Sequence, residues 1–126
     1  MNKLTLIGIM SLLLALTASS AHAKDGDKAA VRSGSCSAAS DWKLKVKSDD
    51  GRLETEFEVD QNRIGKRWRV TLTRNGATVF RGIRTTTAPS GSFTVSRLLA
   101  AAASGRIVAT AKALQSGETC RAAVSL

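Results

Sequence analysis

Arginine and lysine side chains crowd one stretch of this 126-residue chain. No Asp or Glu occurs from Gln61 to Gly117, so these cations have no acidic neighbour along the sequence. Guanidinium groups bind phosphate and carboxylate through paired hydrogen bonds, and the stretch therefore predicts contact with an anionic partner. The alternative is a charged surface that serves solubility alone. The predicted binding residues are Arg67, Arg69, Arg74, Arg81 and Arg84.

Charge is divided unevenly along the chain. Residues 24–60 carry seven basic and nine acidic side chains, whereas residues 61–126 carry eleven basic side chains and one acid, Glu118. Such a basic region suits an anionic polymer, a membrane surface or an acidic protein. Sequence-specific nucleic-acid binding is not expected, because stacking platforms are few and most aromatic residues point inward by alternation. The aromatic residues are Trp42, Phe57, Trp68, Phe80 and Phe93.

Residues suited to catalysis are scarce. The single histidine, His22, falls within a predicted signal peptide, so the mature chain lacks Ser-His-Asp and Cys-His catalysis and histidine metal ligands. Glu54, Glu56 and Glu58 share one strand face, and each has a lysine opposite. Lysine favours the ionised carboxylate, whereas a general acid must be protonated. We expect a protein that is not an enzyme and has no cofactor.

The loop from Asp60 to Gly65 has a partial likeness to a calcium loop. Its acid, Asn and Gly fall at suitable positions, but Ile64 and Thr71 stand where an EF-hand needs an oxygen ligand and a bidentate Glu. The neighbouring cations also repel a metal ion. We therefore predict a connecting loop and no metal site.

The N-terminus has the three-part pattern of a secretory signal peptide. A positive start is followed by an uncharged run of 14 residues, Leu4 to Thr17, and by an A-x-A motif that ends at Ala23. The alternative is a membrane anchor, but a spanning helix needs about 20 residues. We expect cleavage after Ala23 and a secreted, extracellular or periplasmic product that is soluble and monomeric.

Two cysteines remain after residue 23, Cys36 and Cys120. In an exported chain an even number predicts one disulfide, and two free buried thiols are the alternative. The polar segment 24–35 shows no periodicity and predicts a flexible tail. The expected organisation is a signal peptide over 1–23, this tail, and one domain over 36–126.

Two alternating runs flank Asp50-Gly51, a dipeptide typical of a two-residue hairpin turn. Pairing residues whose numbers add to 101 brings lysines opposite glutamates on one face and mainly apolar side chains together on the other. Both patterns agree on one register, which a one-residue slip would break. The predicted pairs are Lys43–Glu58, Lys45–Glu56, Lys47–Glu54, Trp42–Val59, Leu44–Phe57 and Val46–Thr55.

A second hairpin is predicted over Arg67 to Arg84 with its turn at Asn75-Gly76. A two-residue turn places Val79 and Ile83 inward, and Arg84 outward. A three-residue bulged turn places Phe80 inward and Arg81 outward, beside Arg67 and Arg69. We favour the second register, because burial of a phenylalanine contributes about 2–3 kcal/mol.

The remaining segments complete an all-β pattern. Residues 88–91 predict a turn, 92–97 a strand and 98–103 a single helical turn. A last hairpin pairs residues whose numbers add to 231, with a loop over 114–117. Its predicted pairs are Ala111–Cys120, Ala109–Ala122 and Ile107–Val124.

About seven short strands with regular turns predict an antiparallel two-sheet sandwich with one disulfide. Trp68 is similar to the buried tryptophan of the third immunoglobulin strand, and residues 107–111 followed by Gly117 resemble the last hairpin of fibronectin type III domains. The resemblance implies an immunoglobulin-like or fibronectin type III-like sandwich. It departs from those families in having no tyrosine corner and in its cysteine positions. The predicted mature chain also resembles, over nearly its whole length, small secreted bacterial proteins of uncharacterised function.

The sequence thus predicts a non-catalytic binding module. Its basic hairpin, Arg67 to Arg84, is expected to contact an anionic partner in the cell envelope or outside the cell. The alternative is an interaction or inhibitor-like module that binds proteins through a sheet edge or through loops.

Overall fold

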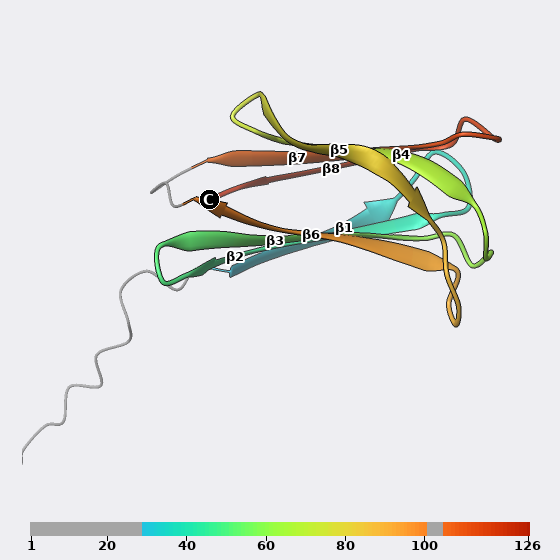
Figure 1. Cartoon of the computed structure of the whole chain (residues 1–126), viewed down its shortest axis with the longest axis horizontal. Helices are drawn as coiled ribbons and strands as arrows, with labels where there is room; N and C mark the ends of the chain where they lie inside the picture. Colours follow the sequence, from blue (N-terminus) through green and yellow to red (C-terminus); the bar gives the residue numbers. More distant parts are fainter. Residues whose placement is uncertain (1–28, 101–104) are drawn as a thin grey trace, which may run out of the picture.

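The strands form two antiparallel sheets that face one another in two layers (Figure 1). The computed structural model describes residues 29–100 and 105–126. Sheet A has the strand order β1-β2-β3-β6, and sheet B has the order β5-β4-β7-β8. The predicted all-β sandwich is confirmed, with eight strands among the described residues in place of about seven. The strands are β1 Ala29–Ser35, β2 Asp41–Asp49, β3 Arg52–Asp60, β4 Arg67–Arg74, β5 Ala77–Thr85, β6 Ser92–Ala100, β7 Arg106–Ala113 and β8 Thr119–Ser125.

Local hairpins account for much of both sheets. All six predicted pairs of the β2–β3 hairpin are observed, around a turn in which Asp50 and Gly51 have φ values of 45° and 76°. The predicted register of the β7–β8 hairpin is confirmed as well, with Ala111 opposite Cys120. In both hairpins the alternation of side chains and the turn position act together to define the register.

The β4–β5 hairpin combines the two registers that the sequence left open. Arg74 pairs with Ala77, so the turn has two residues, Asn75 and Gly76. A bulge between Leu72 and Thr73 then shifts the register by one residue, and Phe80 pairs with Leu72. The extra residue of a bulge reverses which side chains face inward beyond it. Phe80 therefore turns toward the core side, as favoured, where it is half-buried.

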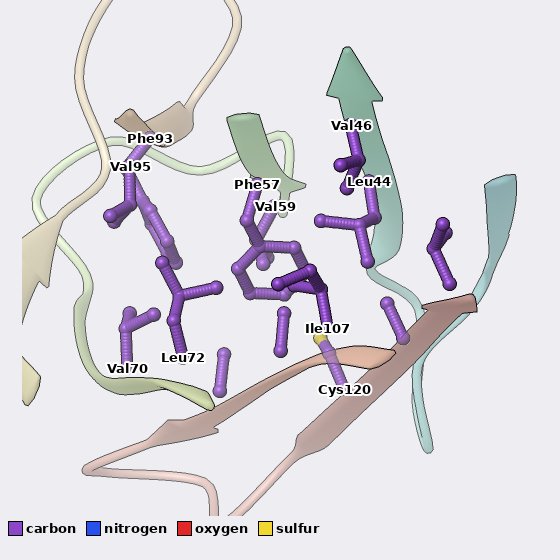
Figure 2. Close-up of a cluster of buried hydrophobic side chains, with 14 of the residues drawn as sticks. Leu44, Val46, Phe57, Val59, Val70, Leu72, Phe93, Val95, Ile107 and Cys120 are labelled. Carbon is purple, nitrogen blue, oxygen red and sulfur yellow. The ribbon is translucent and has the colours of Figure 1, made fainter. Parts of the chain in front are cut away.

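The core fills the space between the layers. Side chains at alternate positions of β2, β3 and β6 meet those of β4, β7 and β8 (Figure 2). Trp68, on the fourth strand rather than the third because β1 precedes it, is fully buried. Its Nε1 donates a hydrogen bond of 2.9 Å to the side-chain oxygen of Gln61. The largest wholly buried apolar side chains are Leu44, Val46, Phe57, Val59, Trp68, Val70, Leu72, Val95 and Ile107.

The predicted disulfide, Cys36–Cys120, is confirmed, and it ties the segment after β1 to β8. Beside it lies Glu118, whose carboxylate accepts hydrogen bonds from the backbone N–H groups of Ala38 and Ser40, both 3.0 Å, and from the Ser40 hydroxyl, 2.7 Å. Glu118 is only 7% exposed. The bridge and the buried carboxylate together join the two sheets along the β1–β8 side.

Two segments differ from expectation. Residues 29–35, expected within a flexible tail, form edge strand β1, which pairs with β2 along its whole length. Main-chain pairing of this kind needs no apolar alternation, so the sequence pattern did not reveal it. The prediction of a helical turn that begins at Leu98 is wrong for residues 98–100. Strand β6 continues to Ala100, and Leu99 is buried opposite Leu53.

Other expectations fall on residues that the structure does not describe. The rest of the predicted helical turn, residues 101–103, lies outside the described ranges, as do the predicted signal peptide over 1–23 and the first part of the predicted tail, residues 24–28. Within the described ranges, no helix is long and apolar enough to cross a membrane.

Candidate functional site

Three of the five predicted binding arginines share the outer face of sheet B. On β4, Trp68 and Val70 are fully buried, so Arg67 and Arg69, at the alternate positions, point away from the core. Arg81 pairs with Thr71, which belongs to the same outward set. All three arginine side chains are exposed. The bulge in the β4–β5 hairpin thus brings Arg81 to the same face as Arg67 and Arg69.

Two further cations, which the sequence analysis did not single out, extend this face. Lys112 on β7 lies directly opposite Arg69, and Arg121 on β8 lies opposite Thr110. Alternation alone would have pointed both side chains outward, since each is flanked by buried residues. The sequence pattern did not reveal that β4 pairs with β7, which lies about 40 residues further along the chain. We call Arg67, Arg69, Arg81, Lys112 and Arg121 the basic face.

A shallow depression of about 350 Å³ lies within the basic face. Three cations, those of Arg69, Lys112 and Arg121, line it together with three threonine hydroxyl groups and the chain at Ala111 and Cys120. None of its lining residues is acidic. The threonines are Thr71, Thr110 and Thr119.

A smaller depression of about 120 Å³ lies at the end of the sandwich where the β3–β4 and β7–β8 loops meet. Arg63, Lys66 and Arg67 supply its charge, and Gln61, Ala113, Gln115 and Ser116 complete its lining. Arg67 therefore contributes to both the end depression and the basic face. Positions two apart on a strand lie about 7 Å from one another, which is the spacing of Arg67 and Arg69.

Arg74 does not join the basic face. It pairs with Ile107, a buried residue, and so lies on the inner side of β4. Its Nη1 donates a hydrogen bond to the main-chain oxygen of Ala100 at the end of β6. Arg74 therefore connects the two sheets at one end of the sandwich, and its position assigns it a structural role.

Arg84 is also separate from the basic face. The bulge places it opposite Trp68, on the inner side of edge strand β5, with its guanidinium 4.8 Å from the centre of the Phe80 ring. Arg97 on β6 approaches the same ring to 4.2 Å. Gly82 leaves room for this ring, because a Cβ there would lie 2.9 Å from Phe80. The three side chains close the β5–β6 side of the sandwich by cation–π contact.

The outer face of sheet A carries a depression of similar size and different charge. It measures about 330 Å³ and is lined by two lysines, two glutamates and a threonine. The register places Lys43 opposite Glu58 and Lys45 opposite Glu56. These glutamates therefore belong to a mixed, charge-balanced surface.

Side-chain hydrogen bonds, from the loop itself and from the neighbouring residues Trp68 and Thr86, stabilise the predicted connecting loop after β3. Asp60 accepts a hydrogen bond of 3.0 Å from the backbone N–H of Asn62, and Gln61 accepts the one from Trp68. Thr86 donates from its hydroxyl to the Arg63 carbonyl, 2.5 Å, and accepts from the Lys66 N–H, 2.9 Å. Among the described residues, no group of three or more His, Cys, Asp or Glu side chains is placed to hold a metal ion.

No protein-family model, curated protein or solved structure matches this chain. The two-sheet architecture is confirmed, whereas the closer resemblance to immunoglobulin-like and fibronectin type III domains stays a prediction. The candidate site therefore depends on the arrangement of charge and hydroxyl groups on sheet B.

Proposed function

We propose that this protein is an exported, non-catalytic binding module that contacts an anionic polymer of the cell envelope or extracellular space through the basic face. The observation that carries the proposal is five exposed cations on one outward sheet face whose four strands contain no Asp or Glu. The three-part N-terminal pattern and the Cys36–Cys120 disulfide support an oxidising compartment.

Repulsion between cations of the basic face favours the binding of an anion from outside. Arg69 and Lys112 lie directly opposite one another on neighbouring strands, and like charges in such pairs destabilise a sheet. A bound anion removes this repulsion and gains charge-assisted hydrogen bonds from the same groups. The arrangement therefore costs folding stability in the free protein and favours the bound form.

The dimensions of the face suit a polymer better than a single small ion. Neighbouring strands lie about 4.8 Å apart, so Arg81 on β5 and Arg121 on β8 are separated by about 14 Å across the sheet. Arg67 and Arg69 add about 7 Å along β4. An extended chain with repeated negative groups could contact several of these cations at once.

A salt titration with paired variants tests the proposal. Binding to an immobilised polyanion, such as long-chain polyphosphate, is measured for the wild type and for Arg69→Ala/Lys112→Ala. The binding constant is expected to fall with salt, and removal of two contacts should lower the logarithmic salt slope by about 1.5.

The matched control is Lys43→Ala/Lys45→Ala on the outer face of sheet A. It removes the same number of charges from a depression of similar volume, so net charge is equal in the two variants. Unchanged binding in the control supports a localised site. Equal losses in both variants, or no salt-sensitive binding by the wild type, would overturn the proposal.

Edge strand β1 favours a second candidate, a protein-interaction module. Within the described residues, β1 pairs with β2 alone, and Val31 on it is 47% exposed. Such an edge can accept an added strand from a partner. This function predicts binding that is insensitive to salt and unaffected by Arg69→Ala/Lys112→Ala.

A further inference from the structure

The depression on sheet B presents hydrogen-bond donors in several directions. Arg69 and Lys112 form one row across the sheet with Thr119, and Thr71 and Thr110 form the next row with Arg121. Each arginine and lysine head group offers only donors, and each threonine hydroxyl can donate as well as accept. The two rows lie about 7 Å apart along the strands, and each extends about 10 Å across β4, β7 and β8.

The number and mixture of these donors bear on the chemistry of the ligand. A carboxylate has two oxygens in one plane, and a single arginine satisfies both. A phosphate or sulfate group is tetrahedral: a monoester has three terminal oxygens and a polyphosphate unit has two, and in both cases its oxygens do not all lie in one plane. The depression offers charged donors on three neighbouring strands and hydroxyl donors between them, which matches such a group better than a planar carboxylate.

We infer that this depression is a subsite for a tetrahedral oxyanion, a phosphate or sulfate group, carried on the polymer that the basic face binds. The inference rests on the proposed function and specifies its ligand. Arg69, Lys112 and Arg121 supply the attraction. Thr71 and Thr110, which lie opposite one another and are half-buried, select the tetrahedral group through their hydroxyls.

The positions of the aromatic residues restrict the polymer further. Proteins that bind single-stranded nucleic acid stack bases on exposed aromatic rings. Here Phe57, Trp68 and Phe93 are buried, Phe80 packs at the β5–β6 side, and Trp42 packs against the core from β2. The basic face thus has no aromatic side chain on it, and a polymer without bases fits it best.

A second anionic group can bind in line with the first. Arg67 lies two residues before Arg69 on β4 and lines the end depression, where Arg63 and Lys66 add charge. A polymer with regularly repeated oxyanions would occupy both positions, and the second contact would form at high effective concentration. Chain length should therefore strengthen binding well beyond that of one inorganic phosphate.

The test compares three probes on the full exported chain: long-chain polyphosphate, a sulfated polysaccharide and poly-L-glutamate. Binding is measured by calorimetry for the wild type and for Thr71→Val/Thr110→Val, which removes two hydroxyls, retains all charges and keeps β-branched side chains. We expect polyphosphate or the sulfated polymer to bind the variant about tenfold more weakly, with binding of polyglutamate unchanged. Thr94→Val, in the charge-balanced depression of sheet A, is the control and should change none of these affinities.

The outcomes separate this inference from the proposed function. If polyglutamate binds the wild type as tightly as the other probes, or the threonine variant weakens all three equally, the inference fails and the proposed function stands. If none of the probes binds with salt sensitivity, both fail. Selective loss of polyphosphate or of the sulfated polymer supports the inference, and the stronger of the two identifies the source of the oxyanion. Thermal unfolding of each variant shows whether it retains the fold.

Discussion

The two sheets of this protein have the same number of described strands, but they differ in the balance of basic and acidic residues. The strands of sheet A carry six basic and six acidic residues, whereas those of sheet B carry eight basic residues and no acid. In sheet A, the lysines of β2 lie opposite the glutamates of β3. In sheet B, Arg69 lies opposite Lys112. The charged residues are Arg32, Asp41, Lys43, Lys45, Lys47, Asp49, Arg52, Glu54, Glu56, Glu58, Asp60 and Arg97 in sheet A, and Arg67, Arg69, Arg74, Arg81, Arg84, Arg106, Lys112 and Arg121 in sheet B.

The two sheets differ in where the counter-charges of their cations lie. Sheet A carries its counter-charges within its own hairpin, and its outer surface therefore needs no external ion. The acid nearest to sheet B in sequence, Glu118, is buried and bound to the segment around Ser40, so it does not face Arg69 or Lys112. The four strands of sheet B carry no Asp or Glu that could pair with its cations.

The largest expected effect comes from breaking the covalent link between the sheets. Cys36→Ala/Cys120→Ala opens a loop with a sequence separation of 84 residues. We expect a loss of about 4.6 kcal/mol in the free energy of unfolding, from the greater chain entropy of the unfolded state. Urea denaturation followed by tryptophan fluorescence measures it. A loss below about 1 kcal/mol would show that the other contacts between the sheets are sufficient without the bridge.

A smaller loss of folding stability is expected when Glu118, the single acid of residues 61–126, is replaced. Glu118→Ala leaves the N–H groups of Ala38 and Ser40 without their acceptor, and we expect a loss of about 1–3 kcal/mol in stability. Polyanion affinity, measured where the variant is folded, should stay within error of the wild type. A marked gain in affinity would instead identify Glu118 as a counter-charge of the basic face.

The smallest effect tests the comparison most directly, because its sign differs between the sheets. Arg69→Thr removes a repulsion with Lys112 and should raise stability, whereas Lys45→Thr removes an attraction with Glu56 and should lower it, each by about 0.2–1 kcal/mol. Denaturation midpoints at low and high salt give both values, and the difference should shrink at high salt. Changes of the same sign and size would remove the distinction between the sheets.

Local information was enough for the registers of two of the three hairpins. The Asp50-Gly51 turn and the alternation on both sides of it predicted the β2–β3 register, and the β7–β8 register followed in the same way. Strand β1 was missed, since an edge strand with an exposed side-chain pattern is ordered mainly by its main-chain pairing. Helix-forming composition at Leu98 was overridden by pairing with β3.

The sequence predicted only part of the candidate site. Alternation along one strand shows which side chains face outward, but it does not show which strands are neighbours. Arg67 and Arg69 could be oriented from alternation, while Arg81 and Arg84 depended on a bulge whose position no turn residue marked. Lys112 and Arg121 were missed because the sequence did not show that the β7–β8 hairpin lies beside β4. Arg74 was included because of its charge, although its position opposite Ile107 directs it inward.

The strand periodicity, the hairpin turns, the disulfide partners and the separation of an acid-rich first half from a basic second half could all be predicted from the sequence alone. These properties depend on near neighbours or on composition. Three features appear only in the folded chain. Four of the five strands of the basic half form sheet B while β6 joins sheet A, two of the five predicted arginines turn inward, and Lys112 and Arg121 lie with Arg69 around three threonines. Near neighbours in the sequence do not specify these features, because the pairing of β4 with β7 and the bulge that reverses the side-chain directions of β5 are selected by packing against the opposite sheet.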